Sequence, residues 1–210
     1  MTITLYTGSP GSGKSYNCVR TIYYWLIKRK NNSVIANFDI TINNEKIKKK
    51  IKGKFTRIYD EDINIDYMIN YYKENHKPNV EAQTLLIIDE ASLYFNSREW
   101  MADKGRKEWL KFMAQHRKFG YEIILICQDD RQIDRQIRSL VEYEKIHRKV
   151  NNHKLFSLFP KTLFVCVNYW YVLKMKVDSE MFFYRKKYGE IYNTFNTFNY
   201  KADEISDKSD

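Results

Sequence analysis

The residues best suited to chemistry lie in one short segment near the N-terminus. Gly8-Ser-Pro-Gly-Ser-Gly-Lys14-Ser15 fits the pattern GxxxxGK[ST], and it lies between an apolar run that predicts a strand and a periodic run that predicts a helix. Glycines let successive backbone N–H groups converge on phosphate oxygens, and the N-terminus of the following helix adds its positive dipole. The alternative, an ordinary glycine-rich turn, is disfavoured by the flanking strand and helix. The residues predicted to bind a nucleotide are Gly8, Ser9, Pro10, Gly11, Ser12, Gly13, Lys14, Ser15 and Tyr16.

A pair of acidic residues follows a second apolar run. In Leu85-Leu-Ile-Ile-Asp89-Glu90, four apolar residues precede an acid, which is the Walker B pattern. We expect the Ser15 hydroxyl and Asp89 to hold Mg²⁺, and Lys14 to bridge the β- and γ-phosphates. Glu90 is expected to act as the general base on the water that attacks the γ-phosphate. A kinase has no need of that water, so the pair favours hydrolysis. The alternative is a carboxylate pair that only begins a helix.

Further candidates are an amide and three arginines. Gln128 ends the predicted strand Tyr121–Cys127, and the carboxyl ends of parallel strands border the ligand crevice. We predict that Gln128 senses the γ-phosphate or the attacking water, with a helix cap or a surface amide as the alternative. The candidate arginine fingers are Arg98, Arg117 and Arg138, in their own subunit or a neighbour, with salt bridges or a solvated surface as their alternative roles.

The nucleotide itself can be narrowed from the sequence. No NKxD motif occurs, and no glycine is preceded three positions earlier by Asp. Because GTP-specific switches carry these motifs, ATP is the expected substrate.

Composition bounds the class of protein and its partners. The 210 residues are 43% hydrophobic and 16% aromatic, which excludes a disordered or fibrous chain. A net charge of +10 favours a polyanionic partner, either nucleic acid or an anionic membrane. The three cysteines form no CxxC, which fits a reducing cytosol, and we expect no zinc, haem or flavin. The longest apolar stretch, Leu163–Leu173, is too short to span a bilayer. The basic segments that are candidates to face DNA are Lys46–Lys54, Arg131–Arg138 and Arg148–Lys154. For Lys46–Lys54, the alternative is a solvated helix or loop.

The order of elements indicates how these residues are positioned. A strand, a glycine loop, a helix and a second strand form one βαβ unit, which predicts a parallel sheet. Residues 1–200 are expected to form one domain, and 201–210 a polar, disordered tail. The predicted strands of the sheet are Thr2–Thr7, Ser33–Phe38, Thr84–Asp89 and Tyr121–Cys127. The predicted helices are Lys14–Lys30, Asp62–Glu74, Gly105–Lys118 and Arg131–Lys149. Added antiparallel strands are predicted in Thr162–Val177, Met181–Lys186 and Ile191–Phe198.

A set of motifs occurs in succession along the chain: Thr7–Ser15, Ile88–Ala91, Phe95, Ser97-Arg98, Gln115–Arg117, Cys127-Gln128, Ile133-Asp134, Ile137-Arg138 and Tyr188–Thr194. Taken together, these motifs resemble one family, the zonular occludens toxin (Zot) family, whose members include the gene I assembly ATPases of filamentous phages. The resemblance covers roughly residues 1–198. Its most specific part is the succession of His-Arg, strand, Gln and Ile-Arg.

The resemblance implies a fold and a function. The expected fold is a RecA-like P-loop NTPase of the α/β class, related to the FtsK/HerA motors, with a mainly parallel central sheet flanked by helices. The expected function is an oligomeric ring ATPase that drives export or packaging of viral DNA during virion assembly. It would work in the host cytoplasm, at the cytoplasmic face of the inner membrane or on a membrane-anchored partner. The alternatives are a nucleotide-gated assembly scaffold with little turnover and a small-molecule kinase.

Overall fold

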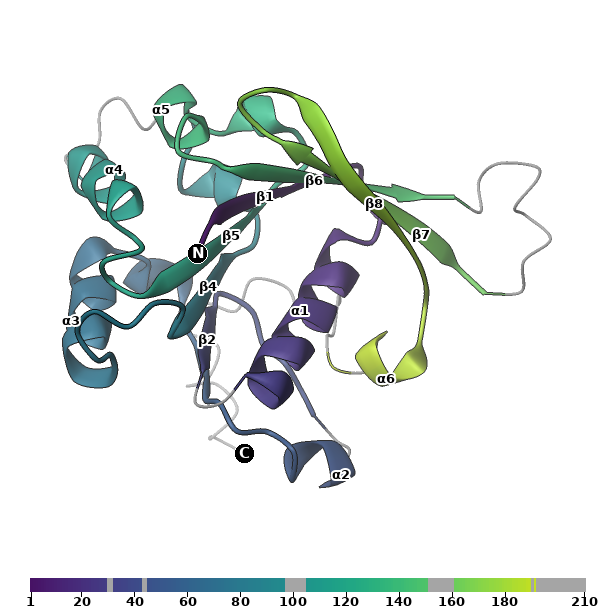
Figure 1. The fold of residues 1–210 in the computed structure, drawn as a ribbon, viewed down its shortest axis with the longest axis horizontal. Coiled ribbons are helices and arrows are strands. Elements are labelled where there is room, and N and C mark those ends of the chain that lie inside the picture. Colours follow the sequence, from purple (N-terminus) through teal and green to yellow (C-terminus); the bar gives the residue numbers. More distant parts are fainter. Residues whose placement is uncertain (30–31, 43–44, 97–104, 151–160, 190, 192–210) are drawn as a thin grey trace, which may run out of the picture.

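The computed structural model describes residues 1–29, 32–42, 45–96, 105–150, 161–189 and 191. Its strands form one eight-stranded sheet (Figure 1). In chain order, the strands are β1 (Ile3–Thr7), β2 (Ser33–Ala36), β3 (Phe55–Arg57), β4 (Thr84–Ile88), β5 (Tyr121–Ile126), β6 (Tyr143–Lys149), β7 (Leu163–Trp170) and β8 (Met175–Phe183). The α-helices are α1 (Lys14–Lys28), α2 (Glu45–Lys48), α3 (Ile65–Asn75), α4 (Arg106–Ala114), α5 (Arg135–Arg138) and α6 (Lys186–Gly189).

The sheet is parallel over most of its width. Its strand order is β3-β2-β4-β5-β1-β6-β7-β8. In this order, all strands from β3 through β6 run parallel, and β7 and β8 add an antiparallel hairpin beside β6. The carboxyl ends of β4, β5, β1 and β6 therefore meet at one edge of the sheet, where ligands bind in open α/β sheets. The expected α/β architecture with added antiparallel strands is confirmed.

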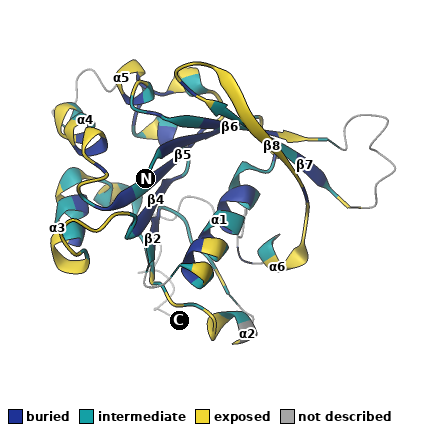
Figure 2. Ribbon diagram, in the orientation of Figure 1, coloured by how far each residue is buried: buried dark blue, intermediate teal, exposed yellow. Residues whose placement is uncertain are grey.

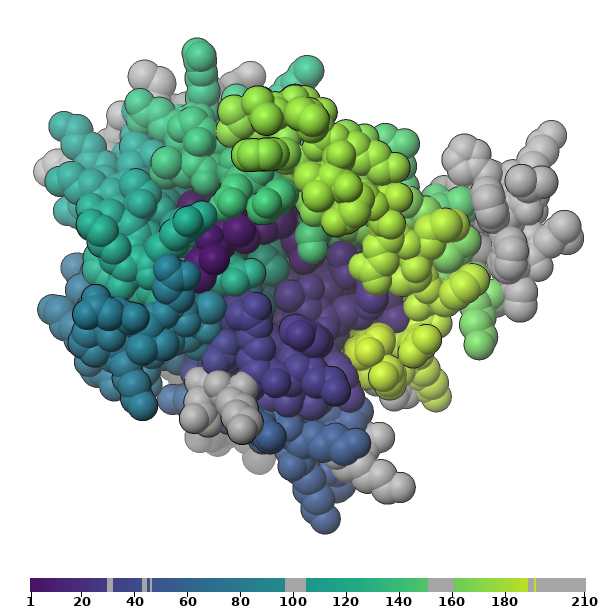
Figure 3. All heavy atoms as spheres, in the orientation of Figure 1, coloured from purple at the N-terminus to yellow at the C-terminus, as the bar shows by residue number. Residues whose placement is uncertain are grey.

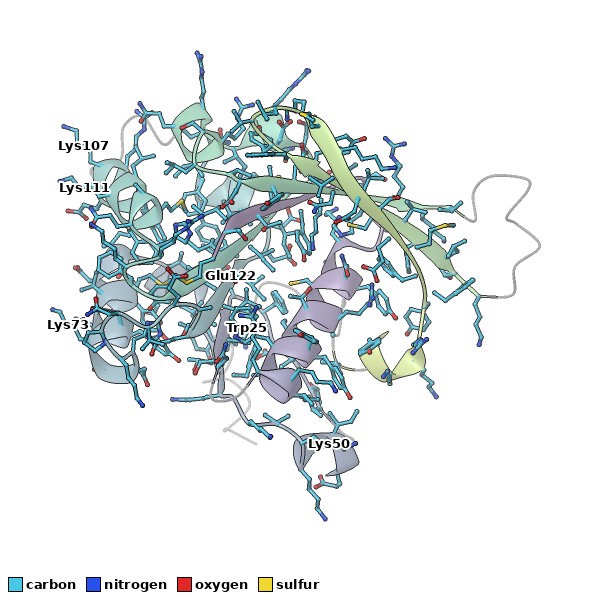
Figure 4. The ribbon with its side chains drawn as sticks, viewed as in Figure 1. Trp25, Lys50, Lys73, Lys107, Lys111 and Glu122 are labelled. Atoms are coloured by element: carbon cyan, nitrogen blue, oxygen red, sulfur yellow. The ribbon has the colours of Figure 1, made fainter. Side chains whose placement is uncertain are left out.

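Apolar side chains cover both faces of the central strands. Tyr6 on β1 and Val34 on β2 pack against Ile22 and Trp25 of α1 on one face. On the other face, residues of the same strands pack against α3, α4 and α5. Figure 2 shows the central strands buried and most of β8 exposed. Figure 4 shows Trp25 on the side of α1 that faces the sheet, whereas Lys73 and Lys107 point outward from α3 and α4.

One predicted helix is wrong. Residues Arg131–Lys149 were expected to form a single helix, but only Arg135–Arg138 is α-helical, and Tyr143–Lys149 is the strand β6. The helical spacing of Ile133 and Ile137 belongs to a short capped turn, in which the Asp134 carboxylate accepts a hydrogen bond from the Gln136 N–H. The residues that follow pair with β1 on one side and β7 on the other, and this pairing decides their conformation.

Other boundaries also differ from the sequence expectation. The predicted strand Thr162–Val177 is divided by a turn at Tyr171–Lys174, where Lys174 has a φ of +51°. The predicted strand Met181–Lys186 ends at Phe183, and α6 begins at Lys186. Helix α4 ends at Ala114, well before Gly120. The third added strand is described only at Ile191, and the predicted tail 201–210 lies outside the described residues.

None of the helices in the described part of the chain has the length and apolar character needed to cross a membrane. The longest of them, α1, has 15 residues.

Candidate nucleotide-binding site

The loop between β1 and α1 has a backbone that only glycine adopts readily. Gly8, Gly11 and Gly13 have φ values of +139°, +72° and +96°. A Cβ on Gly8 would lie 2.4 Å from the carbonyl oxygen of His147, and a Cβ on Gly13 would lie 2.6 Å from the Phe164 ring. The loop is therefore packed against β6 and β7, and Gly8 and Gly13 are required by contact as well as by conformation.

Lys14 reaches back over this loop from the first turn of α1. Its Nζ donates hydrogen bonds to the carbonyl oxygens of Gly8, at 2.7 Å, and Ser9, at 3.2 Å. Partial burial lowers the pKa of Lys14, and the nearby charges of Glu90 and Asp89 oppose that shift. The loop thus holds a cation at its centre, with both acids of the second motif within electrostatic range.

The two acids follow β4, as expected. The Asp89 N–H donates to the Asn37 Oδ1 at 2.7 Å, and the Asn37 Nδ2 donates back to the Asp89 carbonyl at 3.1 Å. The Glu90 N–H donates to the Asp89 Oδ1 at 2.9 Å, and Glu90 has a left-handed backbone with a φ of +48°. Sequence reasoning missed Asn37, although its place just after β2, the neighbour of β4, was a usable signal. Its amide fixes the backbone that presents both carboxylates.

Gln128 follows β5, between the acids and the loop. Its carbonyl oxygen accepts a hydrogen bond from the Gly8 N–H at 3.2 Å, so the backbone of Gln128 holds the start of the loop. Its side chain is exposed. The position agrees with the expected edge of the sheet, and the sensor role of the side chain stays a prediction.

On the other side of β1, the loop borders a cavity of about 590 Å³. One wall is Gly8–Ser12, and the other is Ile146, His147, Arg148 and Lys149 at the carboxyl end of β6. Sequence reasoning missed this wall as part of the site because it placed these residues in a helix. The sequence held one usable signal for this wall: two basic residues come directly after a segment that contains Tyr143, Ile146 and His147.

Two buried polar residues tie β6 to the base of the loop. The His147 Nε2 lies 3.0 Å from the Asn17 Nδ2 on α1, and its Nδ1 lies 3.2 Å from the Thr7 carbonyl oxygen. Burial lowers the pKa of His147 to about 4, so the ring is neutral at pH 7. The Thr7 hydroxyl donates to the Glu144 Oε1 at 2.9 Å. These bonds fix the end of β1, from which the loop departs.

Tyr16 lies beside the loop but faces the added strands. Its ring stacks on Phe164 and Phe182. Its hydroxyl donates to the Phe183 carbonyl at 3.3 Å and accepts from the Arg185 N–H at 2.8 Å. The predicted contact between Tyr16 and a nucleotide stays a prediction, and the observed contacts give Tyr16 a packing role between α1 and the hairpin.

Two of the predicted arginine fingers, Arg117 and Arg138, lie in the described part of the chain, and both lie beside carboxylates. Arg117 Nη2 lies 2.9 Å from Glu142 Oε2, next to the amino end of β6 and therefore at the opposite edge of the sheet. Arg138 lies 3.8 Å from the carboxylate of Asp130. Arg98 lies outside the described residues. If Arg117 contacts a nucleotide, that nucleotide belongs to a neighbouring subunit.

The donors present suit a nucleotide with a hard cation. The Ser12 hydroxyl is buried in the loop and lacks a hydrogen-bond partner in the structure, and a Cβ on Gly11 would meet no atom within 4 Å. A loop with an unpaired hydroxyl and an open side matches an anion cradle. In the part of the chain that is described, no three His, Cys, Asp or Glu residues gather as a metal cluster. The hydroxyl of Ser15 and the carboxylate of Asp89 offer oxygen donors, which Mg²⁺ prefers alongside phosphate oxygens.

Comparison with known sequences identifies relatives over most of the chain. The family model described as Zonular occludens toxin (Zot) matches residues 2–193. The Gene 1 protein of Escherichia phage If1 is 28% identical over 157 residues, which are 72% of this chain and 42% of that protein. The Gene 1 protein of Enterobacteria phage M13 is 28% identical over 141 residues, or 66% and 39% of the two chains. The chain thus spans about two fifths of the length of these relatives.

Comparison with solved structures identifies the fold. The N-terminal domain of zonular occludens toxin from Neisseria meningitidis has a TM-score of 0.58 at 18% identity, covering 91% of this chain and 98% of that domain. The genome packaging NTPase B204 from Sulfolobus turreted icosahedral virus 2, in complex with ATP-gammaS, has a TM-score of 0.52 at 17% identity, covering 86% and 96%. A third solved structure, an ATPase domain, has a TM-score of 0.60 at 8% identity, covering 91% and 84%. These similarities establish a RecA-like P-loop NTPase fold.

Proposed function

This chain belongs to the zonular occludens toxin (Zot) family, and we propose that it is an ATP-hydrolysing motor that drives export or packaging of viral DNA during phage assembly. The observation that carries the proposal is the arrangement at one edge of the sheet. Lys14 begins α1 and reaches back over the glycine loop, and Asp89 and Glu90 follow β4 close enough to affect its pKa. Gln128 follows β5, which separates β4 from β1.

Each residue has a proposed role in hydrolysis. The loop N–H groups and Lys14 bind the phosphates, and the Lys14 ammonium exchanges its two loop carbonyls for phosphate oxygens. Ser15 and Asp89 hold Mg²⁺, which neutralises charge on the phosphates when bound. Glu90 accepts a proton from the attacking water, and Gln128 orients that water or senses the γ-phosphate.

The relatives support the biological role. The sequence relatives are Gene 1 proteins of phages, and one structural neighbour is a genome packaging NTPase in complex with ATP-gammaS. By analogy, the substrate moved is viral DNA, and the setting is the host cytoplasm or the cytoplasmic face of its inner membrane. The net charge of +10 is consistent with either a DNA or a membrane partner.

A homo-oligomeric ring is part of the proposal. Along the edge strand β8, Met175, Val177, Met181 and Phe183 are between 44% and 60% exposed, and Met181 and Phe183, two residues apart, share one face of the sheet. Figure 3 shows β8, in light green, at the surface beside α1, in purple. An exposed apolar strand face of this kind is a candidate interface between subunits. In such a ring, Arg98, Arg117 or Arg138 would act on a neighbour's nucleotide.

The first test measures phosphate release from Mg·ATP with no acceptor present. An ATPase releases phosphate under these conditions, a kinase is nearly silent, and a scaffold binds ATP without turnover. The Lys14→Ala variant should lose nucleotide affinity as well as turnover. Binding without release by the unaltered chain, at any oligomeric state, would contradict the motor and favour the scaffold.

The second test adds single-stranded DNA. For a DNA motor, phosphate release rises with DNA, and the rise declines with added salt because phosphate contacts release counterions. A rate of phosphate release that does not change with DNA at low salt would contradict a direct motor role, but it would not contradict the ATPase activity.

A further inference from the structure

Two cations at the end of β6 face the same cavity as the phosphate loop. Arg148 and Lys149 line it opposite Gly8–Ser12, and both residues are exposed. The ion pairs formed among the described residues include neither cation. Arg117 and Arg138, in contrast, both lie beside carboxylates. Within the described part of the chain, Arg148 and Lys149 are therefore the cations that line the cavity opposite the loop.

The register of the sheet brings these cations to the loop. β6 runs parallel to β1, and Ile146 pairs with Thr7 at the end of the ladder. The residues that follow Ile146 therefore lie beside the residues that follow Thr7. The contact is close, because the carbonyl oxygen of His147 would lie 2.4 Å from a Cβ on Gly8. The buried bonds of His147 to Asn17 and of Glu144 to Thr7 hold β6 in this position.

The order of the strands decides which part of a nucleotide these cations meet. Asp89, Glu90 and Gln128 follow β4 and β5 on one side of β1, and β6 lies on the other side. Hydrolysis places the γ-phosphate toward Glu90, so the rest of the nucleotide extends toward β6. The cavity there, at about 590 Å³, is within the size range of small-molecule sites.

We propose that Arg148 and Lys149 bind the α- and β-phosphates of the nucleotide held by the loop of their own subunit. The proposal rests on the proposed ATPase function and adds two residues to its site. The α- and β-phosphates are common to ATP and ADP and do not react. Contacts to them stabilise substrate, transition state and product alike, so they lower KM and leave kcat nearly unchanged.

A DNA contact is the competing role for the same cations. The cavity favours the nucleotide, because its opposite wall is the phosphate loop itself. A contact to DNA would require a surface that tracks a phosphate backbone, and among the described residues the cavity wall at β6 offers two cations, both at the end of one strand.

The test compares Arg148→Gln and Lys149→Gln with the unaltered chain. Each substitution removes one charge from an exposed strand end. Isothermal titration with Mg·ATP and with Mg·ADP should show each variant binding both nucleotides about tenfold more weakly, the effect of losing one charge-assisted hydrogen bond. Steady-state phosphate release should show KM rising by a similar factor, with kcat within about threefold of the unaltered value.

Lys145→Gln is the matched control. Lys145 lies on the same strand, but its Nζ lies 5.5 Å from the centroid of the Tyr6 ring, and it does not line the cavity. We expect its nucleotide affinity to equal that of the unaltered chain. If all three variants bound nucleotide equally weakly, the effect would come from the net charge of the protein alone, and the proposal would be overturned.

Three other results would also overturn it. These are unchanged affinity for both nucleotides, a fall in kcat with unchanged ADP affinity, and loss only of stimulation by DNA. Lys14→Ala distinguishes the inference from the function on which it rests. If Lys14→Ala abolishes nucleotide binding and the β6 variants do not weaken it, only the inference fails. If Lys14→Ala leaves binding intact, the proposed ATPase site itself fails.

Discussion

The two sides of β1 carry different chemistry. On the side of β4 and β5 lie two carboxylates and an amide, Asp89, Glu90 and Gln128. On the side of β6 lie two cations, Arg148 and Lys149, above the buried, neutral His147. Acids beside a phosphate repel it and are useful where a proton must be accepted or a cation held. Cations attract it and are useful for binding. The difference indicates that one side of the loop carries out the reaction and the other side binds the nucleotide.

Replacing Glu90 by Gln is the change expected to have the largest effect, and it tests the reactive side. The amide cannot accept the proton from water, so kcat should fall by about 10²–10⁴-fold. Nucleotide affinity should be preserved, because the loop and β6 are unchanged. Single-turnover phosphate release measures the first quantity and isothermal titration the second.

A loss of ATP binding in Glu90→Gln would mean that the carboxylate supports the fold of the loop rather than the reaction. Gln has nearly the same size and shape as Glu, so we expect the variant to keep the left-handed backbone at this position. The substitution therefore changes charge with little change in shape.

Replacing Gly8 by Ala tests the contact between the loop and β6. The added Cβ meets the His147 carbonyl oxygen at 2.4 Å, and the φ of +139° strains an L-residue. We expect a loss of about 3 kcal/mol in the free energy of unfolding, measured by urea denaturation.

Gly11→Ala is the matched control for this contact. Its φ is also positive, at +72°, but nothing lies within 4 Å of the added Cβ. It should lose only about 1 kcal/mol, the cost of backbone strain alone. Equal losses in the two variants would show that β6 does not press on the loop.

The neutral state of His147 makes the β6 side sensitive to acid. Its pKa is lowered from 6.5 to about 4 in the folded chain, so between these values the unfolded chain binds the extra proton. This contribution to stability is fully present above pH 6.5 and is lost as the pH falls toward 4. From pH 7 to pH 5 the loss is about 1–2 kcal/mol.

The His147→Gln variant isolates that contribution, because glutamine does not titrate. Urea denaturation at both pH values should give a smaller acid-induced loss in the variant than in the unaltered chain. An identical loss in both would show that His147 is protonated, or exposed, in the folded chain.

Arg117→Ala should have the smallest effect on the chain itself. The residue forms an exposed ion pair with Glu142 at the edge of the sheet opposite the loop. We expect a change of less than about 0.5 kcal/mol in the free energy of unfolding and no change in nucleotide affinity. A fall in kcat that appears only at concentrations where subunits associate would identify Arg117 as a finger for a neighbour's site.

The sequence alone could predict the reactive side of β1 because its motifs are local. A few neighbouring residues are enough to predict each element: the glycines and Lys14 indicate a loop and the start of a helix, and the apolar run before Asp89 indicates a strand. Their positions in the fold were confirmed as expected, and their roles in hydrolysis stay predictions. The parallel sheet followed from the single βαβ unit.

The β6 side of the loop could not be predicted, because the strand conformation of β6 depends on partners that are distant in the sequence. Glu144 and His147 are buried polar residues that hydrogen-bond to Thr7 and Asn17, which lie 137 and 130 residues earlier. Such residues show neither the apolar run of a buried strand nor clean alternation. Helical spacing at Ile133 and Ile137 therefore dominated the interpretation, and Arg148 and Lys149 were assigned to a possible DNA surface.

The measurement that tests this division most directly is a parallel determination of kcat and ATP affinity for Glu90→Gln and Arg148→Gln. We predict that Glu90→Gln loses turnover by at least about 10²-fold with its affinity preserved, and that Arg148→Gln loses affinity about tenfold with its kcat within about threefold of the unaltered value. If both substitutions depress the same quantity, the two sides of β1 do not divide reaction from binding, and the account is contradicted.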